Sequence, residues 1–256
     1  MHPRESPLPP RLAAGLKAAR LRRAPGTGQA HGMFTLILAA FLWVGLHVGV
    51  AGTRLRRTLV ARLGDGGFRG AFSVASAVSI TLLVLAWRNA ETTPLWAAPP
   101  ALGWLLVAVM LLAFILFAGS LMTRNATSVG QNAALSAEPR GVLRITRHPM
   151  LWAFALWGAV HVVGNGDSAA LVFFGAFLLT AALGMPSLDA KVAARDPTAW
   201  AGFAARTSVL PFAAVAMGRN RLAWREIAWP ALVGLIAWAA VLHVHPAVFG
   251  VSPIPR

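Results

Sequence analysis

Long apolar runs alternate with short polar and basic segments along this chain. A run of about 18 uncharged residues is long enough to cross the roughly 30 Å hydrocarbon core of a bilayer as an α-helix. Five runs reach that length, at residues 33–52, 70–87, 102–123, 168–185 and 227–249. A shorter run, residues 150–163, follows Pro149 and ends at the sequence GNGD. The pattern therefore predicts an all-α, polytopic membrane protein, a bundle of about six transmembrane helices.

Two segments depart from this pattern. The apolar run at 209–217 is too short to cross a membrane, so we expect it to lie at the interface or to be re-entrant. Residues 1–32 are basic and rich in Pro, Ala and Gly. We interpret them either as a disordered N-terminal extension or as a stretch that is not translated, with Met33 as the true start. The transmembrane domain is then residues 33–256.

Composition supports membrane insertion. The chain is 57% hydrophobic and only 12% charged, whereas soluble domains carry roughly a quarter charged residues. Cysteine is absent, which excludes disulfides and thiolate chemistry. The net charge of +15 does not require nucleic acid as a partner, because basic loops can lie on anionic lipid.

Lysine and arginine predict the orientation. They concentrate in residues 53–69, 124–147 and 188–225, and the opposite connections carry few of them. Basic loops stay on the cytoplasmic side of a membrane. We therefore predict a multi-pass protein of the inner (plasma) membrane, with both ends of the six-helix core outside the cytoplasm.

Three histidines are the candidate functional residues. His47 lies in the first apolar run, His161 in the fourth, and His148 just before Pro149. An ionisable residue in a bilayer is costly and usually marks a functional site. Neutral imidazole is a frequent metal ligand, and histidines on two helices can hold a haem iron. The alternative is that they hydrogen-bond to carbonyls and hold helices together.

The other residues exclude several chemistries. None of the eight acidic residues lies inside an apolar run, which argues against a carboxylate proton relay or a hard-cation site in the bilayer. No nucleotide-binding or serine-hydrolase motif is present, and a zinc site would lack ligands. Thr146 and Pro149 are a plausible N-cap and first residue for the fourth helix. Arg147 and His148 then either anchor the helix at the membrane surface or face a carboxylate or phosphate of a cofactor.

Three stretches carry a resemblance to a known family. They are LHVGVAGTRLR from residue 46, GVLRITRHPMLWAFALWGAVHVVGNGD from residue 141, and TAWAGFAARTSVLPFAAVAMGR from residue 198. In this order they resemble the NnrU family, bacterial membrane proteins tied to nitrogen-oxide metabolism and denitrification. The family also includes the plant 15-cis-zeta-carotene isomerase.

The resemblance implies a haem b site. It places the axial ligands at His47 and His161, with His148 as the histidine of the RHP motif, and Arg147 is then expected to pair with a haem propionate. The iron would act on a nitrogen oxide or on a polyene, and components of a nitrogen-oxide reductase are possible partners. The isomerase has a cysteine near its second ligand where this chain has Gly158, which argues against thiolate exchange and carotene isomerisation here.

Depth along the helices suggests a different pair. His161 lies about 20 Å along its helix from His148. His47 is near the cytoplasmic end of its own run, closer in depth to His148. Depth therefore favours His47 with His148, whereas the family favours His47 with His161.

Two further functions remain open from the sequence. The stretch GVLRITRHPM and the later DPTAWAGFAARTSVLPF also resemble membrane methyltransferases of the isoprenylcysteine carboxyl type. Their RHPxY tyrosine and late acidic pair are missing, and only Asp189 stands nearby. A non-catalytic assembly factor for a reductase is the third possibility.

Overall fold

The computed structural model describes residues 27–125 and 135–255. Most of the predicted N-terminal extension, residues 1–26, lies outside the described residues. All regular secondary structure within them is helical, apart from one bridge that pairs Pro94 with Asp167. Five helical stretches are long and apolar enough to cross a membrane. The prediction of an all-α, polytopic membrane protein is confirmed.

Within the described residues, six long helices form the bundle. They are α2 (Thr27–Val44), which the π-helix η1 (Gly45–Val50) continues, α3 (Leu55–Asn89), α4 (Pro100–Met122), α5 (Pro149–Asn165), α6 (Ser168–Arg195) and α9 (Trp224–Phe249). Helix α5 has 17 residues and is shorter than the five that could cross. The short elements described between the long helices are the 3-10 helix η3 (Gly141–Arg144), α7 (Pro197–Arg206) and α8 (Ala213–Ala216).

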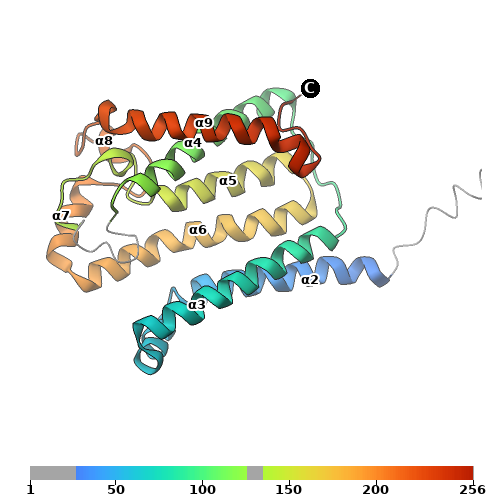
Figure 1. Cartoon of the computed structure of the whole chain (residues 1–256), viewed down its shortest axis with the longest axis horizontal. Coiled ribbons are helices and arrows are strands. Elements are labelled where there is room, and N and C mark those ends of the chain that lie inside the picture. The colour runs from blue at the N-terminus through green and yellow to red at the C-terminus, as the bar shows by residue number, and fades with distance from the viewer. Residues whose placement is uncertain (1–26, 126–134, 256) are drawn as a thin grey trace, which may run out of the picture.

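The long helices pack side by side in an order that differs from the chain order. Helix α3 packs on α2, α2 on α6, α6 on α5, α5 on α4, and α4 on α9 (Figure 1). Helix α6 therefore stands between the α2–α3 pair and the rest of the bundle. One apolar core joins α2, α3 and α6 around Leu36, Leu83 and Phe173. A second joins α4, α5, η3 and α9 around Leu116, Val142 and Ile227.

A two-residue turn fixes α5 antiparallel to α6. Gly166 ends α5 in the left-handed region, at φ 64°, which glycine adopts without strain. Asp167 caps α6, because its carboxylate accepts a hydrogen bond of 2.8 Å from the N–H of Ala170. The carbonyl of Gly166 also accepts from the N–H groups of Leu95 and Trp96, which ties the turn to the α3–α4 connection.

Small residues allow the central helices to approach closely. A Cβ atom on Gly158 of α5 would lie 2.9 Å from the carbonyl oxygen of Phe174 on α6. A Cβ atom on Gly234 of α9 would lie 2.7 Å from the Cα of Ile115 on α4. Such glycines let backbones touch where lipid provides no hydrophobic force between helices.

Several helices extend beyond the apolar runs that predicted them. Helix α3 begins at Leu55 and not at residue 70, with a break at Gly64, and α6 continues to Arg195 and not to residue 185. Arginine and lysine are good helix formers, so a helix can continue past the hydrocarbon into water. The run at 209–217 contributes only the single turn α8, in agreement with the prediction that it does not cross.

Candidate functional site

His47 lies on the π-helix η1, among aromatic rings. π-Helices are rare and occur frequently at functional sites. Its Nδ1 lies 2.9 Å from the carbonyl oxygen of Trp43, one turn earlier. The imidazole ring is 3.9 Å from the Trp43 ring and 5.4 Å from the ring of Phe72, which it meets edge-on.

His161 of α5 has the same local arrangement. Its Nδ1 lies 2.8 Å from the carbonyl oxygen of Trp157, again one turn earlier. Its ring stacks on Phe174 of α6 with the centroids 4.6 Å apart. A carbonyl oxygen only accepts hydrogen bonds, so Nδ1 is the protonated nitrogen in both histidines. Each Nε2 then carries a lone pair, which is the form that binds a metal.

The tryptophans that precede the two histidines contact the same phenylalanine. Trp43 and Trp157 both contact Phe177 of α6, with ring centroids 5.0 and 5.1 Å apart. Helix α2 runs parallel to α6, because the contact of Trp43 with Phe177 is followed by one of Gly52 with Ser187. Helices α2 and α5 are therefore antiparallel, and each histidine lies one turn beyond its tryptophan in opposite directions.

Both imidazole rings lie against the turn that precedes them, because each reaches a tryptophan carbonyl there. The His161 ring also stacks on Phe174, and the His47 ring meets Phe72. Imidazoles held in this way on two helices are of the kind that bind a haem iron.

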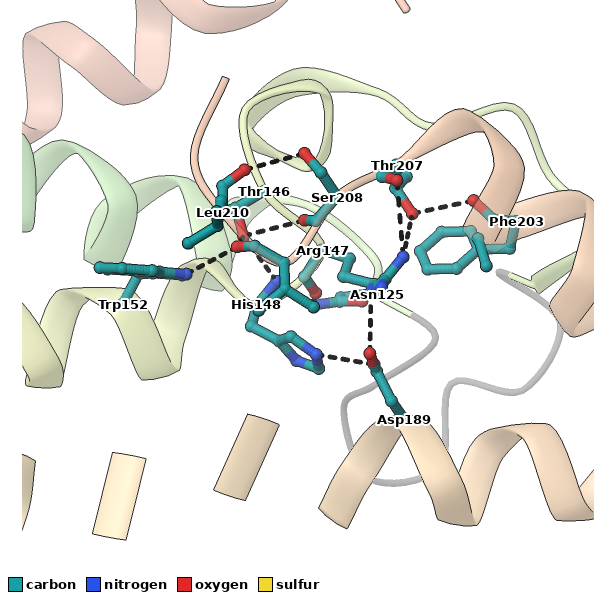
Figure 2. Close-up of polar contacts among 12 residues, drawn as sticks. Asn125, Thr146, Arg147, His148, Trp152, Asp189, Phe203, Thr207, Ser208 and Leu210 are labelled. Carbon is teal, nitrogen blue, oxygen red and sulfur yellow. Dashed lines mark hydrogen bonds and ion pairs between the residues drawn. The ribbon is translucent and has the colours of Figure 1, made fainter. Parts of the chain in front are cut away.

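The RHP motif forms a separate polar cluster around Asp189 of α6 (Figure 2). Asp189 accepts a hydrogen bond of 3.0 Å from Nε of Arg147 and contacts Nε2 of His148 at 2.7 Å. The His148 side chain is fully buried. The guanidinium of Arg147 also lies over the ring of Trp200, 5.2 Å from its centroid.

Backbone contacts fix this cluster to the segment that follows α7 (Figure 2). The N–H of Arg147 donates to the carbonyl of Ser208 at 2.9 Å. The Thr146 hydroxyl and the Trp152 indole N–H both donate to the carbonyl of Val209 at 2.7 Å. Beyond it, Phe212 adopts a left-handed φ of 63°, a strained value for a bulky residue.

The prediction that Thr146 caps α5 is wrong. His148 is the N-cap residue, and no side chain caps the helix. The Thr146 hydroxyl accepts a hydrogen bond of 3.3 Å from the N–H of His148, and it donates its own hydrogen to the carbonyl of Val209. The hydroxyl therefore ties α5 to another segment and does not satisfy the first turn of the helix.

The structure divides the four predicted site residues into two groups. His47 and His161 share the aromatic cluster on α6, whereas Arg147 and His148 converge on Asp189. Nε2 of His148 contacts the carboxylate of Asp189, and its buried Nδ1 has no hydrogen-bond partner among the described residues. The sequence reasoning missed Asp189 as a member of the site. The available signal was an acidic residue in a basic segment just past the apolar run 168–185.

A second ion pair closes the same end of the bundle. Nε and Nη2 of Arg144 in η3 donate to the carboxylate of Glu226 in α9 at 3.0 and 3.2 Å. These hydrogen bonds raise the pKa of Arg144 further above its ordinary value, so it is charged at every physiological pH. Within residues 27–125 and 135–255, no three His, Cys, Asp or Glu side chains are grouped to hold a metal ion.

Comparisons with known proteins agree on one family. The family model described as "NnrU protein" matches residues 35–253. The chain is 33% identical over 82 residues to 15-cis-zeta-carotene isomerase, chloroplastic, of Zea mays. That alignment covers 32% of this chain and 22% of the isomerase, so the chain spans about a fifth of that relative. No solved structure matches the chain.

Proposed function

The chain belongs to the NnrU family, and on this premise we propose that it is a membrane protein that binds one haem b between α2 and α5. His47 and His161 would hold its iron. The observation that carries the proposal is their matched geometry: each Nδ1 donates to a tryptophan carbonyl one turn earlier, and both tryptophans contact Phe177. A bound haem would supply one-electron chemistry or a Lewis-acidic iron.

The protein's own residues have two tasks at this site. The carbonyls of Trp43 and Trp157 fix the tautomer and the direction of the imidazoles. The rings of Phe72, Phe174 and Phe177 surround them with apolar surface, which excludes water and disfavours charge.

His148 and Arg147 have a different role in this proposal. Both side chains contact Asp189, so we propose that they hold α5 to α6 at that end of the bundle and do not contact the haem. This assignment replaces the expectation that Arg147 pairs with a haem propionate. It also favours His161 over His148 as the partner of His47.

Absorption spectra of the purified protein test the haem proposal. We expect a Soret band and, after dithionite reduction, sharp α and β bands, because two imidazoles give a low-spin iron. His47→Ala and His161→Ala should each lose this spectrum, whereas His148→Ala, checked for correct folding by gel filtration, should keep it. A colourless protein from haem-replete cells would refute the proposal. Loss in His148→Ala but not in His161→Ala would select the other pair.

We propose isomerisation of an apolar polyene as the reaction, by a route that needs no thiolate, since Gly158 stands where the isomerase has a cysteine. The support is the partial similarity to a carotene isomerase and the absence of acidic side chains from the described aromatic cluster. The test uses cells that accumulate 15-cis-zeta-carotene and measures the ratio of its cis and trans isomers by chromatography. Expression of the wild-type protein should change this ratio, and expression of His161→Ala should not. An unchanged ratio with haem-loaded protein would exclude this reaction. A spectral shift of the reduced protein with nitric oxide would then support the nitrogen-oxide role.

A further inference from the structure

The beginning of α3 is a basic helical segment that stands apart from the bundle. Gly64, at φ 71° and ψ 166°, interrupts the helix, so residues 54–63 form a piece of their own before the spanning part (Figure 1). We call residues 54–63 the basic segment. Figure 1 shows this end of α3 at the lower left, at the bottom of the view. It follows directly on η1 and is joined to a membrane-spanning helix, so its place is at the membrane surface.

Most of the charge of this segment has no acidic partner among the described residues. It contains Arg54, Arg56, Arg57 and Arg62, and the acidic residue of the surrounding stretch 53–70 is Asp65. Asp65 pairs with Arg56 at 3.5 Å, with side chains that are 38% and 62% exposed. Water and salt screen such a pair, so it contributes little to stability.

The same segment has an apolar stripe. Leu55, Leu59 and Leu63 are spaced four residues apart and so share one face of a helix. Leu55 is 47% exposed and Leu63 is 51% exposed. Leucines beside arginines on a helix that lies at the surface are typical of insertion into the headgroup region of a membrane.

A further cation reaches this segment from α6. Nζ of Lys191 donates to the carbonyl of Ala51, just before the segment, and the charge of Arg56 acts on Lys191. The Ser187 hydroxyl donates to the carbonyl of Gly52 at 3.2 Å and fixes the same connection. Like charges held together in this way repel one another, and an external anion relieves that repulsion.

We propose that the basic segment and Lys191 bind the phosphate groups of anionic phospholipids. The apolar stripe enters the lipid, and the arginines reach the phosphates from the same helix, as snorkelling side chains do. Exposed leucines beside the arginines favour a lipid surface over a nucleic acid or an acidic protein. This inference does not depend on haem.

Lipid titration of the full-length protein in mild detergent tests the proposal, with native mass spectrometry as the readout. Wild type should bind phosphatidylglycerol more tightly than phosphatidylcholine. The double variant Arg56→Gln/Lys191→Gln should lose about fivefold in affinity for phosphatidylglycerol for each cation removed. The triple variant Arg54→Gln/Arg57→Gln/Arg62→Gln changes only exposed side chains and should show the same loss per cation without a change in folding.

The double variant Arg221→Gln/Arg225→Gln is the matched control, because it removes the same charge from another basic loop. It should keep its affinity within about twofold. Equal loss in the control would show that net charge and not this surface binds the lipid. Equal binding of the two lipids by wild type would also overturn the proposal.

Discussion

At one end of the bundle, one carboxylate oxygen of Asp189 pairs with Arg147 and the other contacts His148. The histidines and Arg147 could be selected from the sequence because each is a polar side chain in or beside an apolar run. The sequence alone did not pair Asp189 with them, because it is 41 residues from His148 and beyond the end of its apolar run. Only the packing of α6 against α5 brings it to the RHP motif.

Asp189→Asn should therefore lower stability strongly. The substitution removes the carboxylate charge beside the mostly buried Arg147 and weakens a charge-assisted hydrogen bond, which costs about 1.5–3 kcal/mol, and the thermal midpoint in detergent should fall by about 3 °C or more. Asp65→Asn removes a carboxylate from an exposed pair and should cost no more than about 1 kcal/mol. Equal effects of the two substitutions would show that Asp189 does not balance a buried charge.

At the scale of helices, the sequence predicts the hydrocarbon-spanning parts well and the ends poorly. The predicted run 102–123 nearly coincides with α4, and 150–163 with α5. The predicted run 168–185 stops where Pro186, Asp189 and Lys191 begin, yet α6 continues through all three. Hydropathy detects where a helix contacts lipid, and it does not detect where its hydrogen bonds end. The short helix α7 was missed because it is held by its Asp196 cap and contains no long apolar run.

The contact between α5 and α6 gives a prediction at this scale. Gly158→Ala places a Cβ against the backbone of α6 and should destabilise the protein by about 1–3 kcal/mol. Gly175→Ala, one helix away, meets nothing within 4 Å and should be neutral or stabilising by about 0.5 kcal/mol. Thermal unfolding of both variants measures the difference. The reverse order would show that α5 and α6 are not packed at Gly158.

For the whole molecule, the positions of the arginines predict which ends face the cytoplasm. Because the chain has no cysteine, single cysteines can report on each side. A membrane-impermeant maleimide applied to intact cells should label Thr92→Cys and Ser252→Cys but not Ala61→Cys, three positions that are exposed. Permeabilised cells should show labelling at all three. If Ala61→Cys alone were labelled in intact cells, the topology would be the reverse of the predicted one.

The π-helix that carries His47 has a consequence for the hydrogen-bond register of the first helix. The N–H of Ala51 bonds to the carbonyl of Leu46, five residues earlier, where an α-helix would use the residue four earlier. The backbone thus accommodates one residue more than a regular helix of the same length. His47 lies on this segment, and hydrogen bonds from Ser187 and Lys191 to the carbonyls of Gly52 and Ala51 hold the connection that follows it. A candidate ligand on such a segment can shift by one residue without unfolding the helix on either side.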